Sequence, residues 1–259
     1  QMCIRDSDKR DLSLNSQLQS KKSGSVGTVR NLTIMFCDIK GFTPFSESLS
    51  AYDVIFILNR YFSIMREIII KNGGEVNNYI GDAIMAIFGL KESRQQILRT
   101  VNTGLQMLKA MDEFKTYLKE AYDRTFDMRI GIHNGEVIVG SVGYGDDKKL
   151  TVIGDVVNIA SRIEATNKDA GTRLLISENA YSQVKDSIEI DNYLRLKLRG
   201  SRNLITLYEV SNLKNEVLKD YGDAEHKLFN GKKWTRTLPV AELKEGEKKK
   251  FNSNNEEII

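Results

Sequence analysis

The chain contains 259 residues, of which 41% are hydrophobic and 28% are charged, and its formal net charge is +3. This length supports one large domain with flanking segments, and the composition is that of a soluble globular protein. The small net charge excludes the strong attraction that nucleic acids or anionic membranes exert on very basic chains. Cys3 and Cys37 are the only cysteines, which excludes a disulfide framework and favours a reducing compartment such as the cytoplasm.

Polar segments flank an organised central region at 29–212. Residues 1–28 are rich in Ser, Lys, Gln and Gly without sustained periodicity, so we interpret them as a linker or tail. Residues 213–259 are similarly polar and are predicted to form a flexible tail. Since no apolar run is long enough to span a bilayer, membrane attachment is expected only through an additional upstream module.

The central region begins with a predicted strand and a predicted helix. The apolar run at 32–37 is typical of a buried strand, and it ends at Asp38. Apolar residues then recur at helical spacing over 54–69. The Asn-Gly-Gly sequence at 72–74 is a strong signal for the end of that helix.

A hairpin and a second helix are predicted next. The apolar runs 76–80 and 83–88 are separated only by Gly81-Asp82, which predicts a hairpin with a two-residue turn. Helical spacing of apolar residues over 97–111 indicates a second helix. The sequence therefore alternates between strand and helix patterns in this half of the domain.

The second half of the domain has the same mixed pattern. Two strands, 128–132 and 136–142, are expected to form a hairpin around Asn134-Gly135, which is a frequent turn sequence. Asp155 begins a predicted helix with apolar residues on one face. Three further short strands are predicted at 174–176, 194–198 and 205–210. Together these elements indicate an α+β domain with one mixed sheet and helices packed against it.

Two aspartates stand where predicted strands end. Asp38 follows a buried strand, and Asp82 lies in a tight hairpin turn. Two carboxylates brought together repel each other unless a cation neutralises them, and Mg²⁺ binds few protein carboxylates while substrate phosphates complete its coordination. Each residue alone is better explained as a turn or capping residue. As a pair they suggest a site for metal ions and a triphosphate.

Two other segments carry polar groups that suit phosphate chemistry. The residues Gly41, Phe42 and Thr43 follow the first strand and offer backbone N–H groups and a hydroxyl, although many loops contain such residues. Asn158 and Arg162 are four residues apart on a predicted helix and therefore lie on one face. Arginine stabilises developing negative charge on phosphate, whereas the alternative is an ordinary solvated helix face.

Two residues that often act in catalysis are interpreted as structural here. His133 lies between a predicted strand and a predicted turn, where it is expected to hold the local structure. Cys37 is expected to be a small buried residue of the first strand, without a redox role.

Several segments together resemble the catalytic domain of class III adenylate and guanylate cyclases. They are FCDIKGFT at 36–43, GG at 73–74, YIGDAIMAIFG at 79–89, RIGIHNG at 129–135 and TVIGDVVNIASR at 151–162. The resemblance covers residues 29–212, and the segments occur in the family's order. It implies a ferredoxin-like (palm-like) mixed sheet flanked by helices in a single cyclase domain.

The resemblance also implies a role for each residue of the site. Asp38 and Asp82 would hold two divalent metal ions, Mg²⁺ or Mn²⁺, with help from the Ile39 carbonyl. Residues 41–43 would bind phosphates, and a basic residue near the last hairpin, Arg199 or Arg202, would contact the triphosphate. Asn158 would orient the ribose, and Arg162 would stabilise the transition state.

In this family the two sets of residues meet across a dimer interface. Asp38 and Asp82 of one chain would face Asn158 and Arg162 of the other. The resemblance therefore implies a homodimer with two equivalent sites and an inactive monomer. The implied reaction converts ATP to 3′,5′-cyclic AMP and pyrophosphate, by two-metal catalysis.

The position that selects the base departs from the family pattern. Asn78 stands where adenylate cyclases usually have Lys and guanylate cyclases usually have Glu, and its partner position is Thr151. An amide carries both a donor and an acceptor, so it can pair with either purine. Thr151 resembles many bacterial adenylate cyclases and favours ATP, but GTP remains an alternative.

Other classes of function are also considered. A cyclase-like regulatory module without turnover is possible with Asn78, but the presence of Asp38, Asp82, Asn158 and Arg162 argues against it. A diguanylate cyclase shares the palm-like sheet but carries a Gly-Gly-acid-acid-Phe hairpin that this chain lacks. A polymerase palm is disfavoured because no large basic surface is indicated.

Overall fold

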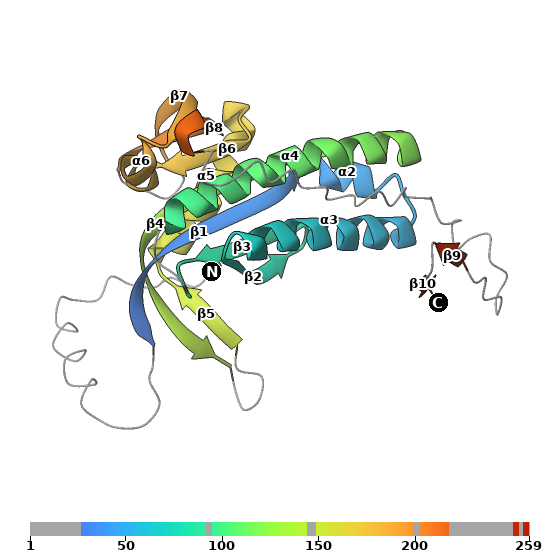
Figure 1. Cartoon of the computed structure of the whole chain (residues 1–259), viewed down its shortest axis with the longest axis horizontal. Coiled ribbons are helices and arrows are strands. Elements are labelled where there is room, and N and C mark those ends of the chain that lie inside the picture. Colours follow the sequence, from blue (N-terminus) through green and yellow to red (C-terminus); the bar gives the residue numbers. More distant parts are fainter. Residues whose placement is uncertain are drawn as a thin grey trace, which may run out of the picture.

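The computed structural model describes residues 27–91, 95–143, 149–198, 203–217, 251–253 and 256–258. Its main feature is a mixed sheet with helices on both faces (Figure 1). In the described part of the chain this sheet has eight strands in the order β2-β3-β1-β4-β6-β8-β7, with β5 paired to β4 outside that path. The expected single α+β domain with a mixed sheet is confirmed.

Four strands and two helices form the ferredoxin-like half of the domain. The sheet here consists of β1 (Thr28–Lys40), β2 (Gly74–Ile80), β3 (Ala83–Phe88) and β4 (Asp127–Val142). The connecting helices are α3 (Ala51–Lys71) and α4 (Gln96–Tyr122). β1 is central and pairs antiparallel with both β3 and β4, which places the ends of these three strands close together.

The remaining elements extend the sheet beyond β4. Parallel pairing of β6 (Leu174–Ser177) with β4 continues the sheet into β8 (Leu204–Leu213) and β7 (Ile188–Lys197). The short helix α6 (Glu178–Val184) follows β6 and was not predicted. β9 (Phe251–Ser253) and β10 (Glu256–Ile258) form a separate two-stranded sheet. The segments predicted as tails, 1–28 and 213–259, lie largely outside the described residues, so those domain boundaries stay a prediction.

The two faces of β1 belong to different cores. Met35 and Cys37 face α3 and α4, whose apolar stripes cover one side of the sheet. Ile34 and Phe36 point to the other side, where they pack with the first turns of α5 (Asp155–Ala170). This alternation follows from the two-residue period of a strand. It also places Asp38 on the α5 side, because Asp38 follows Phe36 by two residues.

One predicted hairpin is wrong. Asn134-Gly135 does not form a turn, because β4 continues through it for 16 residues. The Asn134 amide is buried and donates to the Asn31 side chain, the Leu32 carbonyl and the Thr33 hydroxyl of β1. Gly135 lies opposite Leu32, and a Cβ there would approach Val156 Cγ2 to 2.7 Å. Pairing with β1 and packing against α5 therefore override the local turn preference.

The end of β4 and β5 (Lys149–Ile153) form an antiparallel extension that reaches away from the helices (Figure 1). Strand β5 was not predicted as a separate element. Three apolar residues of this extension, Ile138, Val142 and Ile153, share one face by register and are each about half exposed, at 48–56%. The extension thus presents an apolar surface to solvent.

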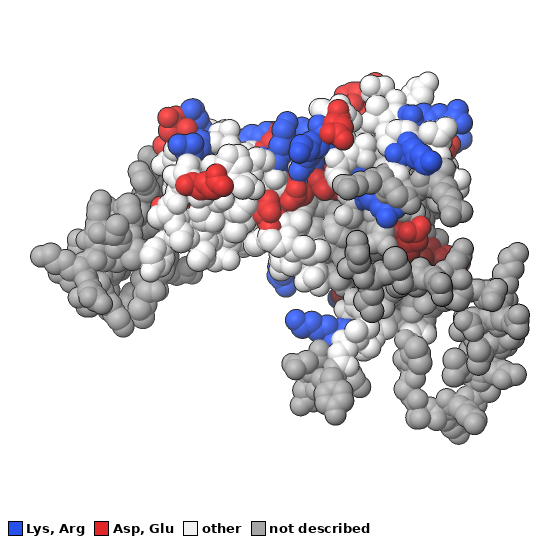
Figure 2. All heavy atoms as spheres, turned by 180° about the vertical axis from the view of Figure 1, so that it is seen from behind, with Lys and Arg blue, Asp and Glu red and all other residues white. Residues whose placement is uncertain are grey.

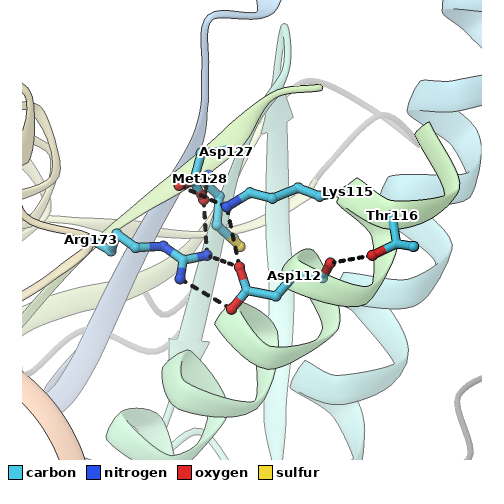
Figure 3. Close-up of polar contacts among 6 residues, drawn as sticks. All are labelled: Asp112, Lys115, Thr116, Asp127, Met128 and Arg173. Carbon is cyan, nitrogen blue, oxygen red and sulfur yellow. Dashed lines mark hydrogen bonds and ion pairs between the residues drawn. The ribbon is translucent and has the colours of Figure 1, made fainter. Parts of the chain in front are cut away.

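A charged cluster fastens α4 to the edge of β4 (Figure 3). Arg173 donates to both Asp112 and Asp127, and Lys115 pairs with the same two carboxylates at 3.2 and 2.9 Å. These contacts, together with the packing of α4 on the sheet, hold the C-terminal half of α4 beside the start of β4. On the side of the molecule shown in Figure 2, Lys and Arg lie next to Asp and Glu, in line with the small net charge.

None of the helices in the described part of the chain is both long enough and apolar enough to cross a membrane.

Candidate active site

Asp38 and Asp82 are brought together by the pairing of β1 with β3. Cys37 lies opposite Ile84, so Asp38 and the turn that contains Asp82 are neighbours at the same end of the sheet. The predicted two-residue turn is confirmed, since Ile80 pairs with Ala83 on either side of it. Both aspartates are half-buried. The pairing of β1 with β3 therefore holds the two carboxylates at one end of the sheet, as the sequence predicts.

The surroundings of Asp82 disfavour its charged form. Burial, and after it the negative charge of Asp38, raises the pKa of Asp82 above its usual value. A bound cation would offset both effects. The described residues contain no cluster of three or more acidic, His or Cys ligands. Two carboxylates fit a hard divalent cation that takes its remaining oxygen ligands from phosphates and water.

Arg129 and Glu164 lie next to Asp38 and are more buried than it is. Neither residue was assigned a role from the sequence. Arg129 is the register partner of Asp38, and its guanidinium lies 2.8 Å from Asp38 Oδ2. On its other side, Nε lies 3.2 Å from Glu164 Oε1. The only signal in the sequence was the presence of Arg129 in the segment 129–135 that carries the family resemblance.

Glu164 is a buried acid on α5. Burial, with a further contribution from the charge of Asp38, raises the pKa of Glu164 to about 7, although Arg129 acts in the opposite direction. The side chains of Arg129 and Glu164 are only 13% and 11% exposed. Arg129 and Glu164 therefore have little access to solvent, whereas the two aspartates beside them are half-buried.

The residues expected to bind phosphate, 41–43, lie at the start of a short helix rather than in a loop. Gly41 has a φ of 83°, in the left-handed region, and caps the short helix α2 (Phe42–Ser46). Phe42 is half-buried and packs against the main core, whereas Thr43 is exposed. The first N–H groups of a helix have no partner within the helix. Residues 41–43 thus lie at the start of a helical turn rather than in an open loop.

Ile39 has a buried side chain in the core beneath α3 and α4. Its carbonyl belongs to the last part of β1, next to Asp38. The role of this carbonyl as a metal ligand stays a prediction.

Asn158 and Arg162 lie on α5, which packs against β1 and β4. The helix begins at Asp155 as predicted, and it buries Val156, Ala160 and Ile163. Asn158 is exposed and Arg162 is half-buried. Among the described residues, Arg162 forms no ion pair with Asp38 or Asp82. Within one described chain, the predicted metal-binding and transition-state residues are therefore not joined by an ion pair.

The residues expected to select the base lie on two different strands. Asn78 is exposed on β2 and follows an irregularity in the pairing with β3, where Asn77 turns its amide toward Met85 Sδ at 3.7 Å. Thr151 lies on β5 opposite Gly140, on the same face as Ile138 and Ile153. Arg199 and Arg202, the alternatives for triphosphate contact, lie outside the described residues.

His133 and Cys37 are buried as expected. His133 Nδ1 lies 2.7 Å from Ser177 Oγ, and burial lowers its pKa to about 4. Burial raises the pKa of Cys37 to about 12. Both groups are therefore neutral at physiological pH, which favours a structural role for each.

Comparison with known proteins identifies the family of the domain. The family model of the adenylate and guanylate cyclase catalytic domain matches residues 25–212. An adenylate cyclase of Anabaena cylindrica is 35% identical over 74% of this chain, and adenylate cyclase 1 of Rhizobium meliloti is 31% identical over 70%. The chain spans only 39% and 27% of the length of these two relatives.

Solved structures of similar fold include enzymes for both purines. The guanylyl cyclase Cya2 superposes with a TM-score of 0.69 at 30% identity, covering 74% of this chain and 96% of that structure. The adenylyl cyclase CyaB from P. aeruginosa superposes with a TM-score of 0.67 at 30% identity, covering 73% of this chain and 97% of that structure. On the extent of the family match, this chain belongs to the adenylate and guanylate cyclase catalytic domain family.

Proposed function

We propose that this chain is a homodimeric nucleotide cyclase that converts ATP to 3′,5′-cyclic AMP and pyrophosphate. The observation that carries the proposal is the placement of two sets of residues on different elements of one chain. Asp38 and Asp82 share one end of the sheet, whereas Asn158 and Arg162 lie on α5, and among the described residues no hydrogen bond or ion pair joins the two sets. A second copy of the chain would bring the missing set to each edge, giving two equivalent sites.

The apolar face of the β4–β5 extension supports this dimer. Ile138, Val142 and Ile153 are exposed on one face, and Thr151 lies among them. Contiguous exposed apolar residues mark interaction surfaces. Covering this face with the partner chain would also bring Thr151 to the interface, where the base would lie.

The reaction requires the ribose 3′ oxygen to attack the α-phosphorus while the bond to pyrophosphate breaks. Asp38 and Asp82 would hold two divalent cations, with the Ile39 carbonyl as a further oxygen ligand. When bound, such cations supply activation of the hydroxyl and charge stabilisation of the leaving pyrophosphate. Mg²⁺ and Mn²⁺ both suit these oxygen ligands.

The protein residues supply position and charge. The first N–H groups of α2, after Gly41, would bind phosphate oxygens, with Arg199 or Arg202 adding positive charge. Asn158 of the partner would orient the ribose. Arg162 of the partner would donate to the phosphate as negative charge develops, and this effect is large where water is excluded.

The choice of ATP rests on Thr151 and on the adenylate cyclases among the relatives. GTP is the second candidate, because the amide of Asn78 both donates and accepts, and because the guanylyl cyclase Cya2 has a similar fold. A catalytically silent regulatory module is a third possibility, disfavoured by the presence of all four catalytic and metal-binding residues.

The test is to incubate the purified dimer with Mn²⁺ and either ATP or GTP, and to quantify cyclic AMP and cyclic GMP. Cyclic AMP as the main product supports the proposal, and cyclic GMP as the main product would reassign the base. The Asp38→Ala variant is the control for contaminating activity. Absence of both products from a folded dimer would identify a regulatory module.

A further inference from the structure

The guanidinium of Arg129 lies between two carboxylates that belong to different elements. Its terminal nitrogen is 2.8 Å from Asp38 Oδ2 on β1, and its Nε is 3.2 Å from Glu164 Oε1 on α5. A guanidinium that holds Asp38 neutralises part of the charge that would attract a metal ion. A metal-binding role for Asp38 therefore requires that Arg129 be drawn away from it or be balanced by another anion.

The contact between Arg129 and Glu164 is incomplete. Although the two groups are within ion-pair distance, Arg129 Nε and Glu164 Oε1 are both buried and form no hydrogen bond among the described residues. Buried polar atoms are almost always hydrogen-bonded, so each exception calls for an explanation. Here the unused acceptor faces the same guanidinium that Asp38 holds.

The backbone fixes Glu164 in this position. Gly131 follows Arg129 by two residues and lies on the same face of β4. A Cβ at Gly131 would lie 2.2 Å from the Glu164 backbone nitrogen, so α5 touches the strand at this point. The Asn167 amide also donates to the Ile130 carbonyl at 3.0 Å. Glu164 is thus held beside Arg129 by the packing of α5 on β4.

We propose that Glu164 is a positioning residue that accepts the Arg129 guanidinium when Asp38 binds a divalent cation. The inference rests on the proposed metal-binding role of Asp38. Glu164 balances the positive charge of Arg129, and the guanidinium moves its hydrogen bonds from Asp38 toward Glu164 as the cation takes the Asp38 oxygens. Without Glu164, Arg129 would compete with the cation for Asp38.

The first experiment measures Mn²⁺ binding to the full-length dimer without nucleotide, from the electron paramagnetic resonance signal of free Mn²⁺. The Glu164→Gln variant keeps the side-chain volume and removes the charge. It should bind Mn²⁺ about 10-fold more weakly, the scale found when outer partners of metal ligands are changed. Glu164→Asp, which keeps the charge, should recover part of the affinity.

Asp169→Asn is the matched control, because Asp169 is an exposed acid on the same helix. It should leave Mn²⁺ binding unchanged. If Asp169→Asn and Glu164→Gln lose the same Mn²⁺ affinity, the loss comes only from the change in net charge. That result would overturn the proposal. Thermal unfolding of each variant shows whether it is folded, and unchanged Mn²⁺ affinity in a folded Glu164→Gln dimer would also overturn it.

A double variant gives the sharper test, since it separates competition from simple structural support. If Arg129 competes for Asp38, combining Arg129→Gln with Glu164→Gln should restore Mn²⁺ affinity to at least that of the wild type. A loss that persists in a folded double variant would contradict the competition. Asp38→Ala separates failure of the role proposed for Glu164 from failure of the metal site itself. Unchanged Mn²⁺ binding in Asp38→Ala would refute the metal site of the proposed function.

Discussion

Asp38 and Arg129 face each other across β1 and β4 as register partners, joined by an ion pair of 2.8 Å. The pair lies at the edge where β1 ends and where the turn with Asp82 begins. Its consequence is that the Asp38 carboxylate is held in one orientation and is already partly neutralised by a guanidinium. A cation that binds the proposed site must therefore displace the Arg129 hydrogen bond from Asp38.

Removal of either aspartate should abolish turnover while the fold persists. Asp38→Ala and Asp82→Ala each take away a carboxylate from the predicted metal site, and cation binding then lacks half of its charged ligands. Cyclic nucleotide formation with Mn²⁺ measures the effect, and circular dichroism confirms folding. Full activity in either variant would refute the metal assignment.

Arg162→Ala should lower kcat by about 100- to 1,000-fold and change KM much less. The reason is that a donor aimed at developing charge contributes in the transition state rather than in substrate binding. Steady-state kinetics over a range of ATP concentrations separates the two constants. A rise in KM alone, with kcat unchanged, would instead assign Arg162 to ground-state binding.

Two inactive variants should complement each other. A heterodimer of Asp38→Ala and Arg162→Ala chains has one site without defects, because each site takes its aspartates from one chain and its arginine from the other. Random pairing at equal concentrations gives heterodimers for about half of the dimers, so about a quarter of wild-type activity should return. Mixing either variant with itself is the control, and absence of rescue would argue against a shared site.

Gly131→Ala should destabilise the domain by about 1–3 kcal/mol or more, because the added methyl group has no space between β4 and α5. Its Cβ would lie 2.2 Å from the Glu164 nitrogen and 2.7 Å from the Ala160 oxygen. Urea unfolding gives the free energy of unfolding. Ala165→Ser, at an exposed position of α5, should change it by less than about 0.5 kcal/mol.

His133 should contribute a loss of stability as the pH drops from about 6.5 to about 4, whereas Glu164, whose pKa burial raises to about 7, contributes in the opposite direction. His133 has a pKa of about 4 in the folded state and an ordinary value of 6.5, so the unfolded chain binds a proton that the native state excludes. Proton uptake on unfolding destabilises the native state by roughly 2–3 kcal/mol at the acid end of this range.

His133→Gln provides the check on that assignment. The wild type and the variant should be unfolded in urea at pH 7 and at pH 4.5. The difference in unfolding free energy between pH 4.5 and pH 7 should shift in the variant toward greater stability at pH 4.5, even if the variant is less stable at both pH values. An unchanged difference would show that other groups cause the acid sensitivity.

Local patterns were sufficient for much of the site. The apolar run before Asp38 predicted β1, the Gly81-Asp82 pair predicted the hairpin turn, and helical spacing after Asp155 predicted α5. Each of these depends on residues close together in the chain. Turn chemistry and hydrophobic periodicity act at that range, so the sequence alone determines where these side chains lie along their elements.

Tertiary structure decided the rest. Asn134-Gly135 is a turn sequence that became the middle of β4, because β1 supplies partners to the buried Asn134 amide. The ion pairs of Arg129 likewise depend on residues 91 positions away on β1 and 35 positions away on α5. The sequence by itself therefore determined β1, the turn between β2 and β3, the start of α5 and, through the family resemblance, the candidate catalytic residues. Only the folded chain decided that Asp38, Arg129 and Glu164 meet at one end of the sheet. Pairing between distant strands is set by packing rather than by local preference.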